Sequence, residues 1–395
     1  MQYQLRDYQQ KAADAAVSYL QDKTVGGGLI IIPTGGGKTH VIADIAHRIN
    51  APILIFAPSR EILLQDYQKM EAVEKGISSM YSASVGQKKI SMVTFATIGS
   101  VNNHPEDFDV FRLIIVDEAH GVEAKGGMYE RFIHRRQDRK VIGLSATPYR
   151  LSQASDGSSV LEFITRTRPR IFDKVLYYCQ ITELLSKGYL AELKYHDLTT
   201  IDLHNVRSNS TGSDYDDKSL VAEYERSGFY DKLAYTTLRA LHPKSGIPRK
   251  GILVFTRFTK EAEELVRKLA NAGVKAAIVT GETPKKERER ILEDFKAGRI
   301  QVCSNVNCLS VGFDFPELDT VILARPTKSL ALYYQQTGRS IRPHKSKKEG
   351  WVIDLAGNYR RFGAVADLKI GLEKPNTERW AVFSKGRQLT NVRIT

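Results

Sequence analysis

The chain has 395 residues, of which 42% are hydrophobic and 26% are charged, enough for two ordinary globular domains. Its net charge is +13 at pH 7, as expected of a protein that binds a phosphate backbone, although a merely basic protein fits this charge equally well. The three cysteines form neither a zinc motif nor a disulfide framework. No apolar run approaches the roughly 20 residues that span a bilayer, and residues 1–6 lack the pattern of a signal peptide. We therefore expect a cytoplasmic protein with no membrane partner.

Short apolar runs alternate with amphipathic stretches in the first half of the chain, which predicts a βαβ arrangement. Each apolar run is brief, rich in β-branched residues and followed by a loop, as is typical of buried parallel strands. The predicted strands are Leu29–Ile32, Ile53–Ala57, Leu113–Val116 and Val141–Leu144, and the predicted helices are Lys38–Ile49 and Glu61–Val73. Further on, Asn205–Asp217 is polar and almost free of aliphatic side chains, so we expect an exposed loop there.

The same alternation restarts in the second half, so the sequence predicts two α/β domains in tandem. The predicted strands are Gly251–Phe255, Ala276–Val279, Ile300–Cys303, Thr320–Leu323 and Trp351–Leu355, and the predicted helices are Lys260–Leu269, Lys286–Phe295 and Leu330–Thr337. Residues 242–248 contain two prolines and a glycine, which favours a linker. We therefore expect domains at 1–245 and 246–360, followed by a basic C-terminal extension at 361–395.

A glycine loop separates the first predicted strand from the first predicted helix. Glycines there let backbone N–H groups turn toward phosphate oxygens, and the helix directs its positive end at the same place. Lys38 can reach the β- and γ-phosphates of ATP, and the Thr39 hydroxyl can bind Mg²⁺. A flexible glycine turn is the alternative, and Ile32 stands where the usual pattern has glycine. The nucleotide contacts predicted from this loop are Pro33, Thr34, Gly35, Gly36, Gly37, Lys38 and Thr39.

An acidic pair follows the strand predicted at Leu113–Val116. Asp117 stands where a carboxylate can hold Mg²⁺, and Glu118 can orient or deprotonate the attacking water. A surface acidic pair at a strand end is the alternative, but the glycine loop earlier in the chain favours a catalytic role.

The ordered motifs resemble superfamily 2 helicases of the DEAH-box type. The greatest likeness is to RadD-like and phage-encoded ATP-dependent helicases, which are related to the motor subunits of restriction enzymes. The resemblance runs from about Leu5 to about Gly357. Beyond the loop and acidic pair, it rests on Leu5–Gln9, Ala57–Glu61, Thr94–Thr97, Ser145–Pro148, Val254–Arg257, Val279–Thr283, Leu309–Asp314 and Gln335–Pro343. It implies two RecA-like domains that hydrolyse ATP to move along nucleic acid, in the cytoplasm of a bacterial or phage-infected cell.

The resemblance also implies a role for each motif residue. Gln9 would bind the adenine edge with support from Arg6, and motif V would add Gly312 and Asp314 to the nucleotide site. His120, Ser145 and Thr147 would couple hydrolysis to domain movement. The nucleic-acid strand would be contacted by Ser59, Arg60, Thr97, Thr256, Arg257, Thr280, Gly281 and Ser310, whose side chains and backbone read phosphate and not base sequence.

The last motif supplies candidate catalytic residues from the second domain. Arg339 and Arg342 are three residues apart and would share a face if the segment were helical. The resemblance implies that they reach the γ-phosphate, with Gln335 beside them. Such an arginine is typically worth about 10³–10⁵ in turnover. Two solvated arginines are the alternative.

The sequence thus predicts an ATP-dependent DNA helicase or translocase with ATP and Mg²⁺ as cofactors. Its expected partners are DNA, either single-stranded or at a fork, and a single-stranded-DNA-binding protein or nuclease subunit. The basic runs at 131–136, 166–170 and 345–348 could guide flanking strand, although a solvated face is the commoner role of such runs. Open alternatives are a restriction or defence motor subunit, a duplex translocase or annealing motor, an RNA helicase, and a binding clamp switched by ATP.

Overall fold

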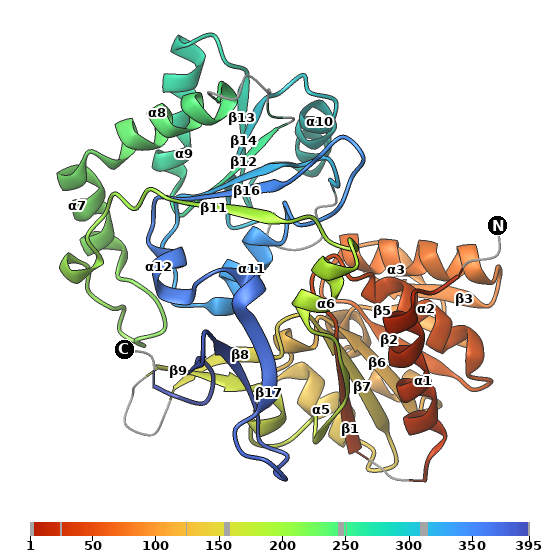
Figure 1. Cartoon of the computed structure of the whole chain (residues 1–395). Coiled ribbons are helices and arrows are strands. Elements are labelled where there is room, and N and C mark those ends of the chain that lie inside the picture. Colours follow the sequence, from red (N-terminus) through yellow and green to blue (C-terminus); the bar gives the residue numbers. More distant parts are fainter. Residues whose placement is uncertain are drawn as a thin grey trace. The chain divides into compact units, whose positions relative to one another are not determined.

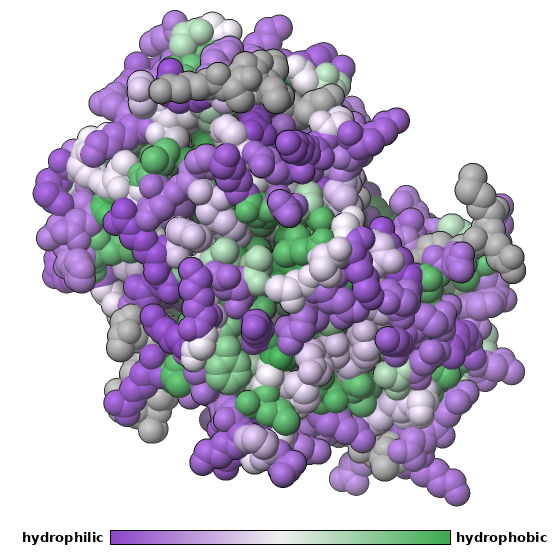
Figure 2. All heavy atoms as spheres, viewed as in Figure 1, coloured by the Kyte–Doolittle hydropathy of each residue, from purple (hydrophilic) through white to green (hydrophobic). Residues whose placement is uncertain are grey.

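The computed structural model describes residues 4–23, 26–123, 125–153, 159–243, 249, 251–308 and 315–393 (Figure 1). Packing divides the chain into two compact units. The first unit comprises Met1–Arg150, Glu162–Glu183 and Lys369–Val392, and the second comprises Leu151–Leu161, Leu184–Leu368 and Arg393–Thr395. Hydrophilic side chains cover most of the face shown in Figure 2. None of the helices in the described ranges is long and apolar enough to cross a membrane.

The first unit is built on an eight-stranded sheet in the order β10-β1-β7-β6-β2-β5-β3-β4. Its neighbours pair in parallel, except that β4 runs antiparallel to β3. The strands are β1 (Gly26–Ile31), β2 (Ile53–Phe56), β3 (Ser78–Ser82), β4 (Gln87–Lys88), β5 (Val93–Ala96), β6 (Leu113–Asp117), β7 (Lys140–Ser145) and β10 (Lys174–Tyr178). The four strands predicted in the first half of the chain are therefore present, and they are nearly completely buried.

Helices cover this sheet, and α2 packs against both α1 and α3. The helices that begin in the first unit are α1 (Asp7–Gln21), α2 (Lys38–Arg48), α3 (Arg60–Val73), α4 (Ile98–Val101), α5 (Met128–His134) and α6 (Ile181–Ser186), with 3₁₀ turns η1 (Pro105–Phe108), η2 (Ala119–Gly121) and η3 (Ile164–Arg166). Position 27 of β1 requires glycine because the backbone of Ile171 lies close to it. A Cβ there would be 1.7 Å from the Ile171 carbonyl oxygen.

The second unit contains a six-stranded parallel sheet in the order β11-β16-β15-β12-β14-β13. Its strands are β11 (Leu193–Asp197), β12 (Ile252–Thr256), β13 (Ala276–Val279), β14 (Val302–Val306), β15 (Thr320–Leu323) and β16 (Gly350–Asp354). Its helices are α7 (Asp217–Ser227), α8 (Phe229–Leu241), α9 (Thr259–Asn271), α10 (Lys285–Lys296), α11 (Leu330–Thr337) and α12 (Asn358–Phe362), with η4 (Leu203–Asn205) and η5 (Val365–Asp367). The strands and helices predicted for this half are present.

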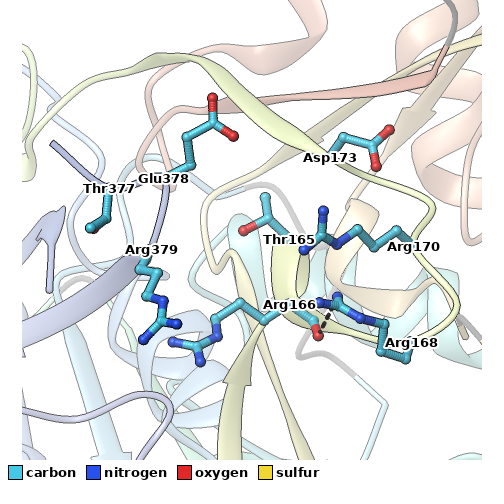
Figure 3. A pocket seen from close by; sticks show the side chains of 8 residues that line it. All are labelled: Thr165, Arg166, Arg168, Arg170, Asp173, Thr377, Glu378 and Arg379. Carbon is cyan, nitrogen blue, oxygen red and sulfur yellow. Dashed lines mark hydrogen bonds between the residues drawn. The ribbon is translucent and has the colours of Figure 1, made fainter.

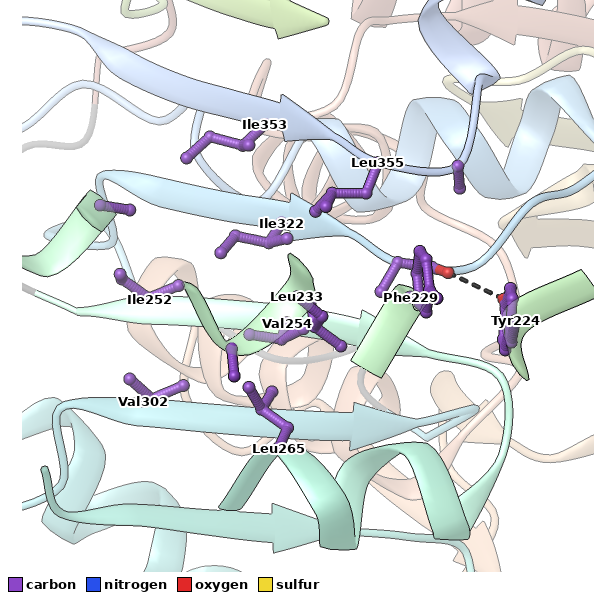
Figure 4. Close-up of a cluster of buried hydrophobic side chains, with 14 of the residues drawn as sticks. Tyr224, Phe229, Leu233, Ile252, Val254, Leu265, Val302, Ile322, Ile353 and Leu355 are labelled. Carbon is purple, nitrogen blue, oxygen red and sulfur yellow. Dashed lines mark hydrogen bonds between the residues drawn. The ribbon is translucent and has the colours of Figure 1, made fainter. Parts of the chain in front are cut away.

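The core of the second unit joins the sheet to α7, α8 and α9 (Figure 4). Tyr224 and Phe229 stack with their ring centroids 4.2 Å apart, and the Tyr224 hydroxyl donates to the Ala324 carbonyl at 2.9 Å. Residues 184–243 therefore pack with the second unit, whereas the sequence analysis grouped them with the first domain. The reason is that β11 pairs with β16, a contact between segments far apart in the sequence.

The polar segment Asn205–Asp217 lies mainly in a loop between η4 and α7, and most of its residues are exposed or half-buried, as its composition predicts, but part of it is fixed by packing. Tyr215 is only 3% exposed and belongs to the hydrophobic core, and Ser208 forms an isolated β-bridge with it. Asp214 and Asp217 accept hydrogen bonds from Arg257. One buried aromatic and two paired acids therefore hold a segment that has almost no aliphatic side chains.

The C-terminal extension, which the sequence left without a fold, forms a three-stranded sheet of β17 (Leu368–Leu372), β18 (Trp380–Ser384) and β19 (Arg387–Gln388). It is attached to the first unit beside β10. The Gln180 side chain pairs with both backbone groups of Ile370, and the Tyr178 and Trp380 rings meet edge to face at 5.1 Å. A separate two-stranded sheet pairs β8 (Tyr149–Gln153) with β9 (Ser159–Phe163).

Glu261 makes the stability of the second unit depend on pH. Its side chain is completely buried on α9, and burial raises its pKa from 4.5 to about 8, although Oε2 accepts the Arg257 N–H at 3.1 Å. Between pH 4.5 and 8 the unfolded chain releases this proton and the folded chain keeps it. The free energy of unfolding should therefore fall as pH rises through this window, by up to about 1.4 kcal/mol per pH unit.

The Glu261→Gln variant tests this prediction, because Gln keeps the backbone acceptor but does not titrate. In a Trp380→Phe background, Trp351 of β16 is the one remaining tryptophan and reports on the second unit. We expect urea denaturation between pH 5 and 8 to give a flatter pH dependence for Glu261→Gln than for the parent. Equal slopes would contradict the assignment.

Candidate ATP-binding site and nucleic-acid contacts

The glycine loop lies between β1 and α2, as predicted. Gly35 and Gly37 have φ of 81° and 75°, a conformation that other residues rarely adopt. Gly37 is the N-cap of α2, so the helix begins at Lys38 with its free N–H groups at the loop. A Cβ on Gly37 would meet Gln9 Nε2 at 2.6 Å, so this position also requires glycine for lack of space.

The N-terminal motif braces this loop directly. Tyr8 Oη and Gln9 Nε2 both donate to the Gly36 carbonyl, at 2.8 and 2.9 Å. Gln9 Oε1 accepts the Arg6 backbone N–H at 2.9 Å. A glutamine amide has two N–H groups and two acceptor lone pairs, so one of each remains for an adenine edge. The sequence analysis did not single out Tyr8, and only the fold shows that its hydroxyl reaches the loop.

Lys38 and Glu118 form an ion pair at the end of the loop. Lys38 Nζ lies 3.1 Å from Glu118 Oε1, and the two side chains are 11% and 19% exposed. Burial works against both charges, but the attraction between them is stronger. Lys38 lowers the pKa of Glu118, and Glu118 raises the pKa of Lys38. Glu118 is therefore ionised, as a group that orients or accepts a proton from water must be.

Asp117 is buried beside this pair with an unused ligand atom. It is 4% exposed, and its Oδ1 has no hydrogen-bond partner among the described residues. Burial, followed by repulsion from Glu118, raises the pKa of Asp117 to about 7. Mg²⁺ prefers hard oxygen ligands and keeps several waters, so Asp117 and the Thr39 hydroxyl fit the predicted metal site. No group of three or more His, Cys, Asp or Glu that could hold a metal ion occurs in the described part of the chain.

The sequence analysis missed a third acid at this place. Asp66 on α3 is 1% exposed, and burial, followed by repulsion from Asp117, raises its pKa well above the usual value, although a side-chain hydrogen bond with Thr39 acts in the opposite direction. The signal was present in the pattern, since the other buried residues of this helix are Ile62, Leu63 and Met70. An acid within such an apolar stripe indicates a buried polar site.

The predicted coupling residues form a connected chain behind the acidic pair. His120 Nδ1 lies 3.3 Å from Glu118 Oε2 and 3.0 Å from Ser145 Oγ. Ser145 Oγ in turn accepts the Thr147 N–H at 3.0 Å. Direct contacts therefore connect Glu118 to the segment after β7, and the role of these residues in coupling stays a prediction.

The predicted strand contacts of the first unit lie at helix starts. Ser59 is the N-cap of α3 and accepts the Ile62 N–H, and Arg60 is the first residue of that helix. Thr97 precedes α4, and its hydroxyl is shared with Ser82 and Ser100 at 3.1 and 3.0 Å. These positions offer hydroxyl and backbone groups, as phosphate contacts do, and their role in binding stays a prediction.

The predicted strand contact Arg257 in the second unit has partners within the fold. Its guanidinium donates to Asp217 and Asp214 at 2.8 Å each and to the Tyr215 carbonyl, and its side chain is 11% exposed. These partners are 40 to 43 residues away in sequence and hold the side chain in place, and its role in binding stays a prediction. Thr256 is also turned inward, where its hydroxyl donates to the Asn305 carbonyl at 3.2 Å.

The loop at Thr280 and Gly281 is held open to solvent. The Thr283 side chain accepts the Thr280 N–H at 2.9 Å, and Arg288 Nη2 donates to the carbonyls of Thr280, Gly281 and Thr283. Gly281 is exposed with open space around its Cα. Ser310, Gly312 and Asp314, and most of the predicted linker at 242–248, lie outside the described residues.

The final motif begins on α11 but does not continue as a helix. Gln335 lies on α11, Gly338 is its C-cap, and Arg339 and Arg342 follow in a turn and a bend. The argument that both arginines share a helical face therefore does not apply. Arg339 is 9% exposed, and burial lowers the pKa of Arg342.

Residues 2–150 match the model of the type III restriction enzyme res subunit, and residues 235–344 match the helicase conserved C-terminal domain. The chain is 28% identical over 373 residues to the putative ATP-dependent helicase IRC3 of Saccharomyces cerevisiae, covering 89% of this chain and 51% of that protein. It is 25% identical to the DNA 3'-5' translocase XPB2 of Sulfurisphaera tokodaii, covering 89% of this chain and 81% of that protein. A putative HsdR subunit fragment of a type I restriction enzyme from Vibrio vulnificus has a TM-score of 0.67 at 22% identity, covering 98% of this chain and 70% of the other.

These matches, together with the two sheets of mainly parallel strands and their helices, define a protein with tandem RecA-like domains. The chain is homologous to superfamily 2 helicases of the IRC3 and XPB types. It spans about half the length of the yeast relative.

Proposed function

We propose that the chain is a DNA-dependent ATPase that uses hydrolysis to translocate along DNA and to unwind it. The observation that carries this proposal is the chain of contacts from Lys38 through Glu118 and His120 to Ser145. It joins a phosphate-binding loop to a candidate base and to the motif predicted to sense hydrolysis. The homology to proteins named as an ATP-dependent helicase and a DNA translocase supports the assignment.

In the proposed reaction, Lys38 and the loop N–H groups hold the phosphates, while Thr39 and Asp117 hold Mg²⁺, which supplies charge neutralisation at the phosphates. Glu118 orients the attacking water and accepts its proton. ATP phosphates would draw Lys38 away from Glu118, so binding of nucleotide prepares the base. Arg339 and Arg342 are proposed to stabilise charge on the γ-phosphate, and the DEAH-box assignment of Asp117–His120 is part of the same proposal.

A second candidate is the motor subunit of a restriction or defence complex, favoured by the match of residues 2–150 to a restriction-enzyme subunit. Such a complex needs a nuclease subunit as partner. Purification with and without candidate nuclease subunits, followed by DNA cleavage assays, separates it from an independent helicase.

The central experiment measures ATP hydrolysis and strand separation against single-stranded DNA, duplex DNA, forked DNA and RNA. We expect DNA to raise the ATPase rate and Lys38→Ala to abolish it, with circular dichroism confirming that the variant is folded. Stimulation by RNA alone would favour an RNA helicase, and an ATPase that no nucleic acid stimulates would contradict the proposal. Stimulation without strand separation would restrict the activity to translocation or annealing.

A further inference from the structure

A pocket of about 270 Å³ lies in the first unit, between the segment that precedes β10 and the turn that joins β17 to β18. Half of its lining side chains carry guanidinium groups. The lining residues are Thr165, Arg166, Arg168, Arg170, Asp173, Thr377, Glu378 and Arg379 (Figure 3). The pocket therefore combines the basic run at 166–170, for which the sequence suggested a flanking strand or a solvated face, with the C-terminal extension.

Two of the four arginines are already engaged. Arg166 Nη1 lies 2.8 Å from Glu373 Oε1, and Arg168 donates to the carbonyls of Arg166 and Thr167. Arg170 and Arg379 are exposed, and their guanidinium groups form no hydrogen bond or ion pair with any residue that the structure describes, although the Arg379 backbone carbonyl accepts the Glu373 N–H at 2.8 Å. Their donors are available to a ligand.

The carboxylates around the pocket do not neutralise these two arginines. Asp173 accepts the Gly27 N–H at 3.0 Å, and Glu373 is bonded to Arg166, Gln388 and Asn391. Glu378 is the remaining acid of the lining. Asp173 keeps its charge when it accepts the Gly27 N–H, so the lining carries four guanidinium groups against two carboxylates, and the excess of positive charge favours an anionic ligand.

Thr165 provides an independent sign of a missing partner. Its side chain lines the pocket, the residue is 4% exposed, and its Oγ1 has no hydrogen-bond partner among the described residues. Leaving a buried hydroxyl unpaired typically costs about 1–3 kcal/mol, so such groups usually have a partner. An oxygen of a bound anion would be that partner.

The pocket is separate from the nucleotide site. Asp173 precedes β10 and bonds to Gly27 near the start of β1, whereas the glycine loop follows the end of β1. The strand between them has six residues, about 20 Å at 3.3 Å per residue. An anion in the pocket is therefore not a phosphate of ATP in the glycine loop.

We propose that this pocket binds a phosphate of the nucleic-acid backbone and gives the first unit a second strand contact outside the helicase motifs. This proposal rests on the proposed function, in which the chain acts on DNA. Planar guanidinium groups match phosphate oxygens with paired hydrogen bonds. The net charge of +13 favours a polyanion, and a hydroxyl beside arginines is typical of contacts to backbone phosphate.

The test measures binding of a dye-labelled oligonucleotide to the full chain, without nucleotide, at several salt concentrations. The Arg170→Ala/Arg379→Ala double variant should bind roughly tenfold or more weakly. Its slope of log affinity against log salt should be smaller by about one for each lost phosphate contact. Arg387→Ala is the matched control, since this exposed arginine lies on the same small sheet but outside the pocket.

Thr165→Val distinguishes a ligand contact from a structural role. Because the hydroxyl has no partner in the fold, its removal should leave the melting temperature unchanged or higher while DNA binding weakens. Parental affinity and salt slope in the double variant would overturn the proposal. So would a double variant that loses binding of poly-glutamate but not of DNA, because the pocket would then hold an acidic protein segment.

The outcomes also separate this proposal from the proposed function. DNA-stimulated ATPase in the parent, with unchanged oligonucleotide binding in the double variant, overturns the pocket alone. Weakened oligonucleotide binding in the double variant, with a parent ATPase that no nucleic acid stimulates, supports the pocket and overturns the proposed function.

Discussion

Replacing Glu118 with Gln is expected to lower ATP turnover by roughly 10²–10⁴-fold, the usual contribution of a positioned general base. ATP binding should be retained or become tighter. In the parent, Lys38 Nζ is paired with Glu118 at 3.1 Å, so removing the negative charge frees Lys38 for the phosphates. Turnover at saturating ATP and DNA, together with equilibrium binding of a fluorescent ATP analogue, measures both effects.

Glu123→Gln is the matched control, because Glu123 is an exposed acid on the same segment. It should keep parental turnover. Lys38→Ala should lose nucleotide affinity as well as turnover, whereas Glu118→Gln should lose turnover alone. A Glu118→Gln variant that hydrolyses ATP at the parental rate would show that another group positions the water.

Replacing Arg339 with Ala is expected to lower turnover by about 10³–10⁵-fold, as loss of an arginine that stabilises a transferring phosphoryl group does. Affinity for ATP should change much less, because the predicted contact strengthens as charge develops on the γ-phosphate. Arg339→Lys should recover little of the rate, since an ammonium lacks the planar fork of guanidinium. Turnover and nucleotide affinity are measured as for Glu118.

Arg299→Ala serves as the control for loss of an arginine from the second unit. Arg299 is exposed and paired with Asp294 at 2.7 Å, an arrangement that contributes little to stability. Arg339 is only 9% exposed, so thermal unfolding must show that its variants are folded. Turnover of Arg339→Ala within twofold of the parent would remove this residue from the catalytic set.

The sequence predicted the local structure well because its signals are local. The strands at Ala276–Val279 and Thr320–Leu323 and the helix at Leu330–Thr337 were predicted with the bounds that the structure has. A buried strand of a parallel sheet is a short apolar run, and a glycine loop before a helix needs no distant partner. The placement of Lys38 at the start of α2 follows from such a signal.

Side-chain partners far apart in the chain were not predictable in this way. Arg257 fits a strand contact by its motif, yet Asp214 and Asp217 bind its guanidinium. The apolar stripe of α3 indicates that Asp66 is buried, but only the fold shows that it meets Asp117. The exposure and charge of these groups depend on what the fold places around them.

The sequence by itself determined two tandem α/β domains with a nucleotide site, because the glycine loop, the acidic pair and each strand or helix signal lie within a few consecutive residues. The resemblance of the ordered motifs to helicases then implied that the domains are RecA-like. Only the tertiary structure decided that residues 184–243 pack with the second sheet and that the C-terminal extension returns to β10. The same holds for the arginine pocket, whose Arg170 and Arg379 are more than two hundred residues apart. Pairing between such distant segments depends on burial and hydrogen bonds that form only when the chain has folded.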